Sequence, residues 1–173
     1  MKKLFSSILV IFLFFTHQVF SEQKIAFIDM DKVISTSKSG SSILKQLTDL
    51  NKKNLKFLKD EEKKFQEKET KLISQKNIIS ETDFKDKIIK LEFEIKNYKK
   101  DRNKMLADFN KLKIDNTNNL LKLINQILVK FSNDKEIAII LQKKDLVVAK
   151  TQLDITNEVI KIINSEVKEF KIK

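Results

Sequence analysis

The chain has 173 residues, with 35 Lys and Arg against 24 Asp and Glu, which gives a formal net charge of +11. It contains one Gly and no Pro, Cys or Trp. These counts exclude disulfides and thiolate metal sites, and so few turn-forming residues favour long helices over a fold with many corners.

The N-terminal segment has the pattern of a secretory signal peptide. Two early lysines precede an apolar run over residues 4–15, which is shorter than the roughly 20 residues that a permanent membrane anchor needs. Small residues follow at Val19 and Ser21, so we expect residues 1–21 to be removed after Ser21. Removal of this segment takes away two lysines and leaves the mature chain with a net charge of +9. An uncleaved signal anchor is the alternative interpretation.

The mature chain opens with a predicted strand over residues 24–30. Apolar side chains fall on both of its faces, which is typical of a strand buried on both sides. Residues 31–42 follow; they are rich in Ser and include the only glycine, Gly40. We interpret this stretch as a polar connector that offers several candidate N-caps for the next helix.

Two long helical segments are predicted next, and their apolar residues form the seam of an antiparallel coiled coil. Residues 43–75 carry a seven-residue repeat that Glu62 and Glu69 interrupt. The predicted stripe consists of Leu44, Leu47, Leu55, Leu58, Phe65, Leu72 and Ile73. The residues from Ser80 to Asp83 fit a capping box, which predicts the start of the second helix.

The second helix has the more regular seam. From residue 84 to 112 its seam positions alternate in steps of four and three, with Arg102 as the one polar member. Successive steps of four then cross residues 113–120. This stutter predicts that the two arms splay or bend there. The polar residues 132–134 are predicted to break the helix.

The C-terminal part is predicted to contain a β-hairpin and a short helix. Residues 136–141 and 146–149 are apolar runs separated by a four-residue turn, as in a hairpin. A last helix is expected to open at Asp154 or Thr156. The apolar side of this helix consists of Val159, Ile162, Ile163 and Val167.

We therefore expect a mainly helical α+β protein. Residues 43–131 form a hairpin arm with its tip near 76–82, and residues 22–42 and 132–173 form a β-containing body at its base. A body of about 60 residues buries little core alone, and strands that are apolar on both faces pair readily with other chains, so we predict a closed homo-oligomer. The residues expected at its contacts are Ile25, Phe27, Ile137, Ile139, Leu141, Val147 and Val148.

The order of these elements and several short strings resemble the Skp/OmpH family of periplasmic chaperones. The strings are Lys-Ile-Ala-Phe-Ile-Asp-Met at 24–30, Ser-Lys-Ser-Gly at 37–40, Ser-Glu-Thr-Asp-Phe at 80–84, Asp-Leu-Val-Val-Ala at 145–149 and Leu-Asp-Ile-Thr-Asn-Glu-Val-Ile at 153–160. The resemblance covers essentially the whole mature chain. One departure is Gln-Lys-Lys at 142–144, where family members often carry Gly.

The resemblance implies a trimer, with a β-barrel body shared between subunits and one helical tentacle from each. It further implies that the tentacles enclose a cavity that holds unfolded outer-membrane proteins in the periplasm, without ATP or another cofactor. Anionic membrane surface or lipopolysaccharide is a further partner that the family and the basic charge allow.

Candidate client-binding residues lie on the predicted arms. Phe57, Ile89 and Phe93 stand beside the seams, so we expect them either to face a client or to broaden the packed interface of the hairpin. Residues 51–105 hold 17 basic and 11 acidic residues, and this excess either attracts the client or is a solvated face. The basic candidates are Lys63, Lys64, Lys85, Lys87 and Lys96.

The mature chain has few side chains suited to catalysis. The only histidine, His17, leaves with the signal peptide and no Cys is present, so we expect no catalytic residue and no metal site. Asp29 and Asp31 could pair as acid and base, but both positions suit turn or helix capping. The alternative to a holdase is a structural coiled-coil adaptor or spacer in the envelope. Specific nucleic-acid binding is not expected, because the chain is exported and has no recognised motif for it.

Overall fold

The computed structural model describes residues 23–167 and 170–172. The expected signal peptide and its cleavage after Ser21 lie outside this range. The described elements are β1 (Lys24–Ile28), α2 (Met30–Thr36), α3 (Lys38–Ser74), α4 (Glu81–Lys135), β2 (Ile137–Gln142) and α5 (Thr156–Glu166), with 3₁₀ turns at Lys143–Asp145 and Thr151–Leu153. The protein is mainly helical and has a small two-stranded sheet.

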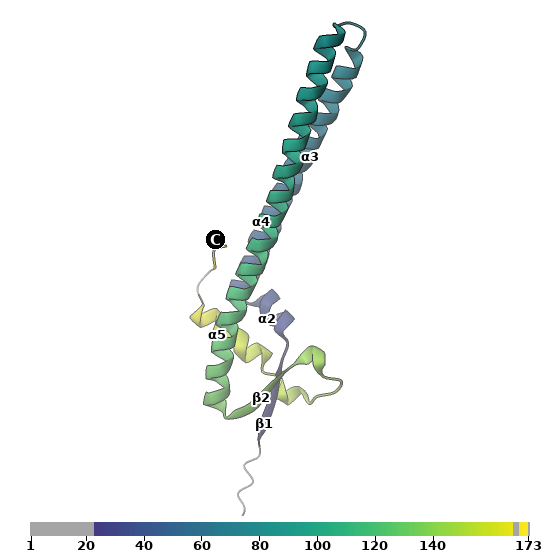
Figure 1. Ribbon diagram of the computed structural model, residues 1–173. Coiled ribbons are helices and arrows are strands. Elements are labelled where there is room, and N and C mark those ends of the chain that lie inside the picture. The colour runs from purple at the N-terminus through teal and green to yellow at the C-terminus, as the bar shows by residue number, and fades with distance from the viewer. Residues whose placement is uncertain (1–22, 168–169, 173) are drawn as a thin grey trace, which may run out of the picture.

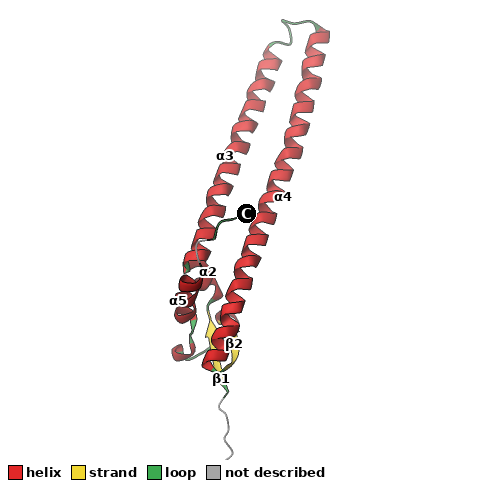
Figure 2. Cartoon of the chain, turned by 90° about the vertical axis from the view of Figure 1, so that its left-hand side faces the viewer, coloured by secondary structure: helices red, strands yellow, loops and turns green. Residues whose placement is uncertain are grey.

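The two long helices lie side by side as an antiparallel hairpin that extends far beyond a small base (Figures 1 and 2). Helix α3 has 37 residues and α4 has 55, so α4 alone is about 80 Å long at 1.5 Å per residue. Among the described residues, no helix is both long and apolar enough to span a bilayer.

Local capping defines where both long helices begin. Ser37 Oγ accepts from the Gly40 N–H (3.2 Å), and Ser80 Oγ accepts from the Asp83 N–H (3.1 Å) while donating to the Asp83 carboxylate (2.6 Å). The predicted cap at Ser80 is therefore confirmed. The predicted connector over 31–42 is wrong, because most of it is helical: it forms most of α2 and the first turn of α3, separated only by the cap at Ser37.

The single glycine allows α2 and α3 to approach each other closely. A Cβ atom at Gly40 would lie 2.0 Å from the carbonyl oxygen of Ile34 and 2.8 Å from its carbonyl carbon. Only a residue without a side chain fits there, because the neighbouring atoms belong to the backbone of α2 and cannot rotate away.

Strand β1 precedes the hairpin and β2 follows it, and the two strands pair in parallel. The sheet therefore brings the two ends of the arm together. Ile25 pairs with Ile139, and Phe27 pairs with Leu141. The Phe27 carbonyl also accepts from the Ile155 N–H (3.0 Å). The predicted first strand is two residues too long, since Met30 begins α2.

The predicted β-hairpin is wrong. Residues 146–149 follow a 3₁₀ turn and are not a strand, and Val147 and Val148 are 100% and 89% exposed. Edge hydrogen bonds require a neighbouring strand, and the described part of the chain gives this segment none. The predicted helix break at 132–134 is also wrong, because α4 continues to Lys135 and ends at Glu136 in the left-handed conformation (φ 55°).

The hydrophobic core lies at the base, where the lower turns of α4 pack against β1, α2, the start of α3 and α5. Val33, Ile124, Val159 and Ile163 are fully buried there. The predicted apolar side of α5 is thus confirmed at Val159 and Ile163, while Ile162 and Val167 are half-buried at its margin.

The buried side of α3 matches the predicted stripe only in part. Leu47 and Leu58 are buried as predicted, whereas Leu44, Leu55 and Ile73 are 43–63% exposed, and near the base Ile43 is buried in place of Leu44. Helix α4 remains helical through 113–120, and the polar stutter residue Asn116 is buried and donates to the Leu112 carbonyl (2.7 Å). Bonding to its own helix satisfies this amide without a partner from α3.

A candidate binding groove along the arm

A groove runs along one side of the hairpin between α3 and α4. It consists of three adjoining hollows of about 440, 310 and 470 Å³, from the base towards the tip. Asp101 and Met105 line both the lower and the middle hollow, and Glu94 lines both the middle and the upper one. The shared walls make the three hollows one continuous feature, which we call the arm groove.

The apolar floor of the arm groove is the coiled-coil seam itself. In a pair of helices, each seam residue is covered by one partner helix and remains open towards the flank. On this floor Leu58 is buried, whereas most of the other apolar seam residues are only half-buried. The half-buried residues on the floor include Leu50, Phe65, Leu72, Leu91, Met105 and Phe109.

Polar contacts cross the seam halfway along the arm. The Tyr98 hydroxyl lies 3.1 Å from a Glu62 carboxylate oxygen and 3.2 Å from the Leu58 carbonyl oxygen, and the Tyr98 ring centroid is 5.2 Å from that of Phe65. Partial burial, followed by the hydrogen bond to Glu62, raises the pKa of the Tyr98 phenol. Arg102 approaches the same carboxylate at 3.9 Å. The two helices are therefore held in one register at this level.

Charge changes sign along the arm groove. Four lysines and one glutamate line the upper hollow, and Lys68 pairs with that glutamate, Glu94. Three carboxylates and Arg102 line the middle hollow, and Asp101, Asp108 and Lys104 line the lower one. The groove is thus basic near the tip and acidic towards the base, with an apolar floor throughout.

Residues 24–163 match the family of OmpH-like outer membrane proteins. The chain belongs to the OmpH-like family. The crystal structure of a proposed OmpH-like outer membrane chaperone from Caulobacter crescentus CB15 has the same fold, with a TM-score of 0.79 over 87% of this chain and 89% of that one. The two sequences are 11% identical, so this likeness concerns the fold. No curated protein matches the sequence.

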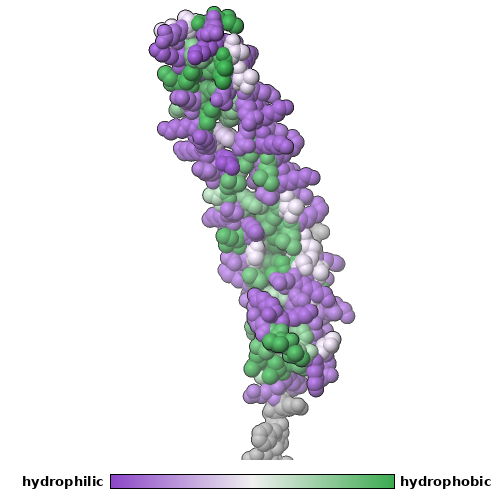
Figure 3. All heavy atoms as spheres, turned by 90° about the vertical axis from the view of Figure 1, so that its right-hand side faces the viewer, coloured by the Kyte–Doolittle hydropathy of each residue, from purple (hydrophilic) through white to green (hydrophobic). Residues whose placement is uncertain are grey.

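The apolar residues predicted to contact a client lie on the surface of this OmpH-like arm. Phe57 is 51% exposed and lines the middle hollow of the arm groove. Ile89 and Phe93 are each 63% exposed and stand one turn apart on α4, outside the groove lining. More than half of each of these three side chains is therefore open to solvent. Figure 3 likewise shows apolar patches between hydrophilic margins along one face of the arm.

Of the predicted basic residues, only Lys87 lines the arm groove, where it reaches Gln75 Oε1 at 3.5 Å. Lys85 pairs with Glu81, Lys63 with Glu67, and Lys64 with Glu61 (2.6 Å). The hydrogen bond that Lys64 donates to Glu61 raises the pKa of Lys64. Lys96 is exposed and lies outside the groove lining. The groove lysines that were not among these candidates are Lys68, Lys71, Lys90 and Lys104, of which Lys90 and Lys104 belong to the basic excess predicted for the arm.

The seam residues of the groove floor were not predicted to bind a client. Periodicity identifies the side of a helix that faces its partner, but it does not show which flank of the helix pair stays open. The two-residue spacing of Leu55 and Phe57 does indicate that these side chains lie on different flanks. At about 100° per residue, Leu55 points to the opposite flank of α3 from Phe57. Leu55 is 55% exposed and does not line the groove.

The residues predicted to join subunits occupy the base of the OmpH-like chain. Ile25, Ile139 and Leu141 are 39–46% exposed on the sheet, and Ile137 is half-buried. Val147 and Val148 project from the segment that has no strand partner. Phe27 is the exception, because it is 7% exposed and belongs to the interior of the body.

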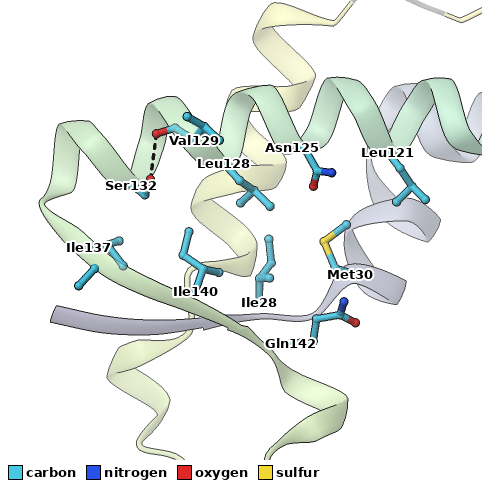
Figure 4. Close-up of a pocket in the computed structure, with 11 residues that line it drawn as sticks. Ile28, Met30, Leu121, Asn125, Leu128, Val129, Ser132, Ile137, Ile140 and Gln142 are labelled. Atoms are coloured by element: carbon cyan, nitrogen blue, oxygen red, sulfur yellow. Dashed lines mark hydrogen bonds between the residues drawn. The ribbon is translucent and has the colours of Figure 1, made fainter. Parts of the chain in front are cut away.

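An apolar cleft of about 470 Å³ opens beside this surface, between α4 and the sheet. In Figure 4, Ile28 and Ile140 point from the two strands towards Leu128 of α4, and Met30 lies at one side. Val129, which also lines the cleft, is 61% exposed. The base therefore presents open apolar surface on its sheet and beside it.

Asp29 of the pair considered for catalysis has a structural role. Its carboxylate accepts from the Lys32 N–H (2.9 Å) as the N-cap of α2, and Lys143 Nζ lies 3.3 Å from its second oxygen. The hydrogen bond from the Lys32 backbone is the main reason that the pKa of Asp29 is lowered. Asp31 is exposed in the first turn of α2.

Proposed function

We propose that this protein is an ATP-independent periplasmic holdase that binds unfolded outer-membrane proteins and prevents their aggregation. The observation that carries the proposal is the arm groove, an open apolar strip between charged margins on an arm held away from the body. An extended polypeptide can place apolar side chains on the floor while its polar backbone stays near water. Membership of the OmpH-like family supports this function.

The arrangement suits weak and reversible binding. The floor residues are already half-buried or buried in the hairpin, so a client gains only part of the apolar area that a deep pocket would provide. The lysines near the tip attract acidic clients from a distance, and the attraction weakens as salt rises. A holder of this kind releases its client without using nucleotide.

We further propose that three chains associate through their bases, so that three arms surround one cavity. The exposed Ile25, Ile139 and Leu141 on the sheet, and Val147 and Val148 beside it, support this assembly. An unpaired segment next to an open sheet edge can gain strand partners from another subunit. The Val147→Asp/Val148→Asp double variant should shift the purified chain from trimer to monomer in sedimentation equilibrium.

The holdase proposal is tested by diluting a urea-denatured outer-membrane β-barrel protein into buffer that contains the mature chain without nucleotide. Light scattering should fall to near the buffer level at about one trimer per client. Phe57→Ser should weaken the suppression, whereas Leu55→Ser is the matched control, because it removes a similarly exposed side chain from the opposite flank of α3. Unchanged scattering with the wild-type chain would exclude the holdase and favour the envelope adaptor.

A further inference from the structure

Residues 170–172 lie beside α3, where Gln46 and Ser42 bond their backbone. Gln46 Nε2 donates to the Phe170 carbonyl (2.7 Å), and Gln46 Oε1 accepts from the Ile172 N–H (3.3 Å). Ser42 Oγ donates to the same Phe170 carbonyl (3.4 Å). Figure 2 shows the C-terminus alongside the lower part of the arm. We call residues 170–172 the tail.

The contact between Gln46 and the tail does not depend on the identity of the tail residues. The carboxamide bonds the C=O of one residue and the N–H of the second residue after it, as a neighbouring β-strand would do. The side chains of Phe170 and Ile172 are half-buried against the hydrophobic core, while Lys171 between them is exposed. The tail therefore has the alternating pattern of an extended amphipathic segment.

The tail lies at the base end of the arm groove. Ser42, Gln46 and Leu50 follow one another at intervals of four on α3, so they share one face of that helix. The first two bind the tail, and Leu50 lines the lower hollow of the groove. The position held by the tail is thus continuous with the surface to which the holdase proposal assigns the client.

We infer that the tail is an internal stand-in for a client, and that an extended apolar segment of an unfolded protein replaces it on Gln46 and Ser42. This inference rests on the proposed function, because it names one subsite for the same clients. Backbone recognition suits a holder with many clients, since every extended peptide offers the same C=O and N–H pair. A client segment bound in place of the tail would lie next to the lower hollow, which Leu50 lines.

The test uses the mature chain with residues 170–173 deleted and a fluorescein-labelled peptide with the sequence of residues 166–173. Fluorescence anisotropy should show binding to the deleted chain and binding at least about tenfold weaker to the full chain, because the tail then occupies the site. Gln46→Ala in the deleted chain should weaken peptide binding by about tenfold, because two hydrogen bonds are lost. Lys45→Ala is the matched control, since Lys45 pairs with Asp49 and does not contact the tail.

A second peptide, taken from a transmembrane strand of the β-barrel client, should displace the labelled peptide, and its apolar-to-Ser version should not. If the client-strand peptide does not displace the labelled peptide, the tail is only a structural latch and the inference is overturned. Labelled-peptide binding that is equally strong with and without Gln46→Ala would also overturn it. Should the deletion impair folding in circular dichroism, the full-length Phe170→Ser/Ile172→Ser variant replaces it and should bind both peptides. Failure of the full chain to suppress aggregation would instead overturn the proposed function, whatever the peptides do.

Discussion

The hydroxyl of Tyr98 on α4 lies 3.1 Å from the carboxylate of Glu62 on α3. Glu62 interrupts the predicted seam of the first helix, and Arg102, the polar member of the second seam, approaches the same carboxylate at 3.9 Å. The two seam irregularities thus meet each other across the hairpin. Their pairing satisfies polar groups that would otherwise oppose apolar residues, and it fixes the register of the arm beside the groove.

Replacing Tyr98 by Phe should destabilise the arm by about 0.5–1 kcal/mol at neutral pH, because one partly exposed hydrogen bond is lost. The raised pKa of Tyr98 adds a pH dependence with a definite sign. Its contribution to stability is complete below the ordinary phenol pKa of 10.0 and is lost as pH rises through the raised value. The wild-type advantage over Tyr98→Phe should therefore shrink as pH rises above about 10.

Urea unfolding followed by circular dichroism at 222 nm measures this difference at each pH. Lysines titrate in the same range in both proteins, so only the difference between wild type and variant is informative. If the difference in unfolding free energy between wild type and variant stays constant as pH rises, the ionisation of Tyr98 is not coupled to its contact with Glu62.

Replacing Gly40 by Ala should destabilise the base strongly, by about 2–3 kcal/mol or more, because the added methyl group would overlap the Ile34 carbonyl at 2.0 Å. The matched control is Ser41→Ala at the next position. Ser41 is exposed and its hydroxyl bonds only its own turn, at the Lys38 carbonyl, so the change should stay within about 0.5 kcal/mol. Thermal unfolding that treats the two variants alike would refute the close approach of α2 to α3.

Replacing Asp29 by Asn should reduce the acid sensitivity of the base. The lowered pKa of Asp29 means that its contribution is complete above the ordinary value of 3.8 and is lost as pH falls through the lowered one. The melting temperature of the wild type should exceed that of Asp29→Asn at pH 7, and the two should converge as pH falls below the ordinary value of 3.8 and through the lowered one. Asp31→Asn, in the exposed first turn of α2, is the control and should track the wild type more closely.

Local sequence signals predicted the elements that local chemistry determines. The Ser80 hydroxyl caps its own helix through residues three positions away, and the seam of α4 follows from periodicity, so neither needs tertiary information. Residues 132–134 look like a helix break on propensity, yet they remain helical, because Phe131 is buried in the core at the same end of α4. The wrong hairpin at 146–149 has a similar origin, since apolar β-branched runs indicate a strand without supplying its partner.

The arm groove was harder to predict than the arm. The seam residues Phe65, Leu72 and Met105 were correctly associated with the contact between the helices, but their half-exposure depends on how α3 and α4 are rotated against each other. That rotation is set by the tertiary packing of the two helices and not by the local sequence of either one. Near the base it also decides that Ile43 faces inward and Leu44 outward, whereas the seven-residue repeat placed Leu44 in the seam.

The sign of the charge along the arm groove predicts how clients approach it. Lys71 and Lys90 line the upper hollow, so the Lys71→Glu/Lys90→Glu variant should slow association of an acidic unfolded client by about tenfold at 20 mM salt. Above about 0.5 M salt the difference should largely vanish, because the Debye length becomes shorter than the distance over which the tip steers the client. Stopped-flow fluorescence with a labelled client measures both rates. The control is Lys113→Glu/Lys122→Glu, which makes the same change of net charge at exposed positions outside the groove lining; equal slowing by this variant would mean that net charge, and not the tip, governs the encounter.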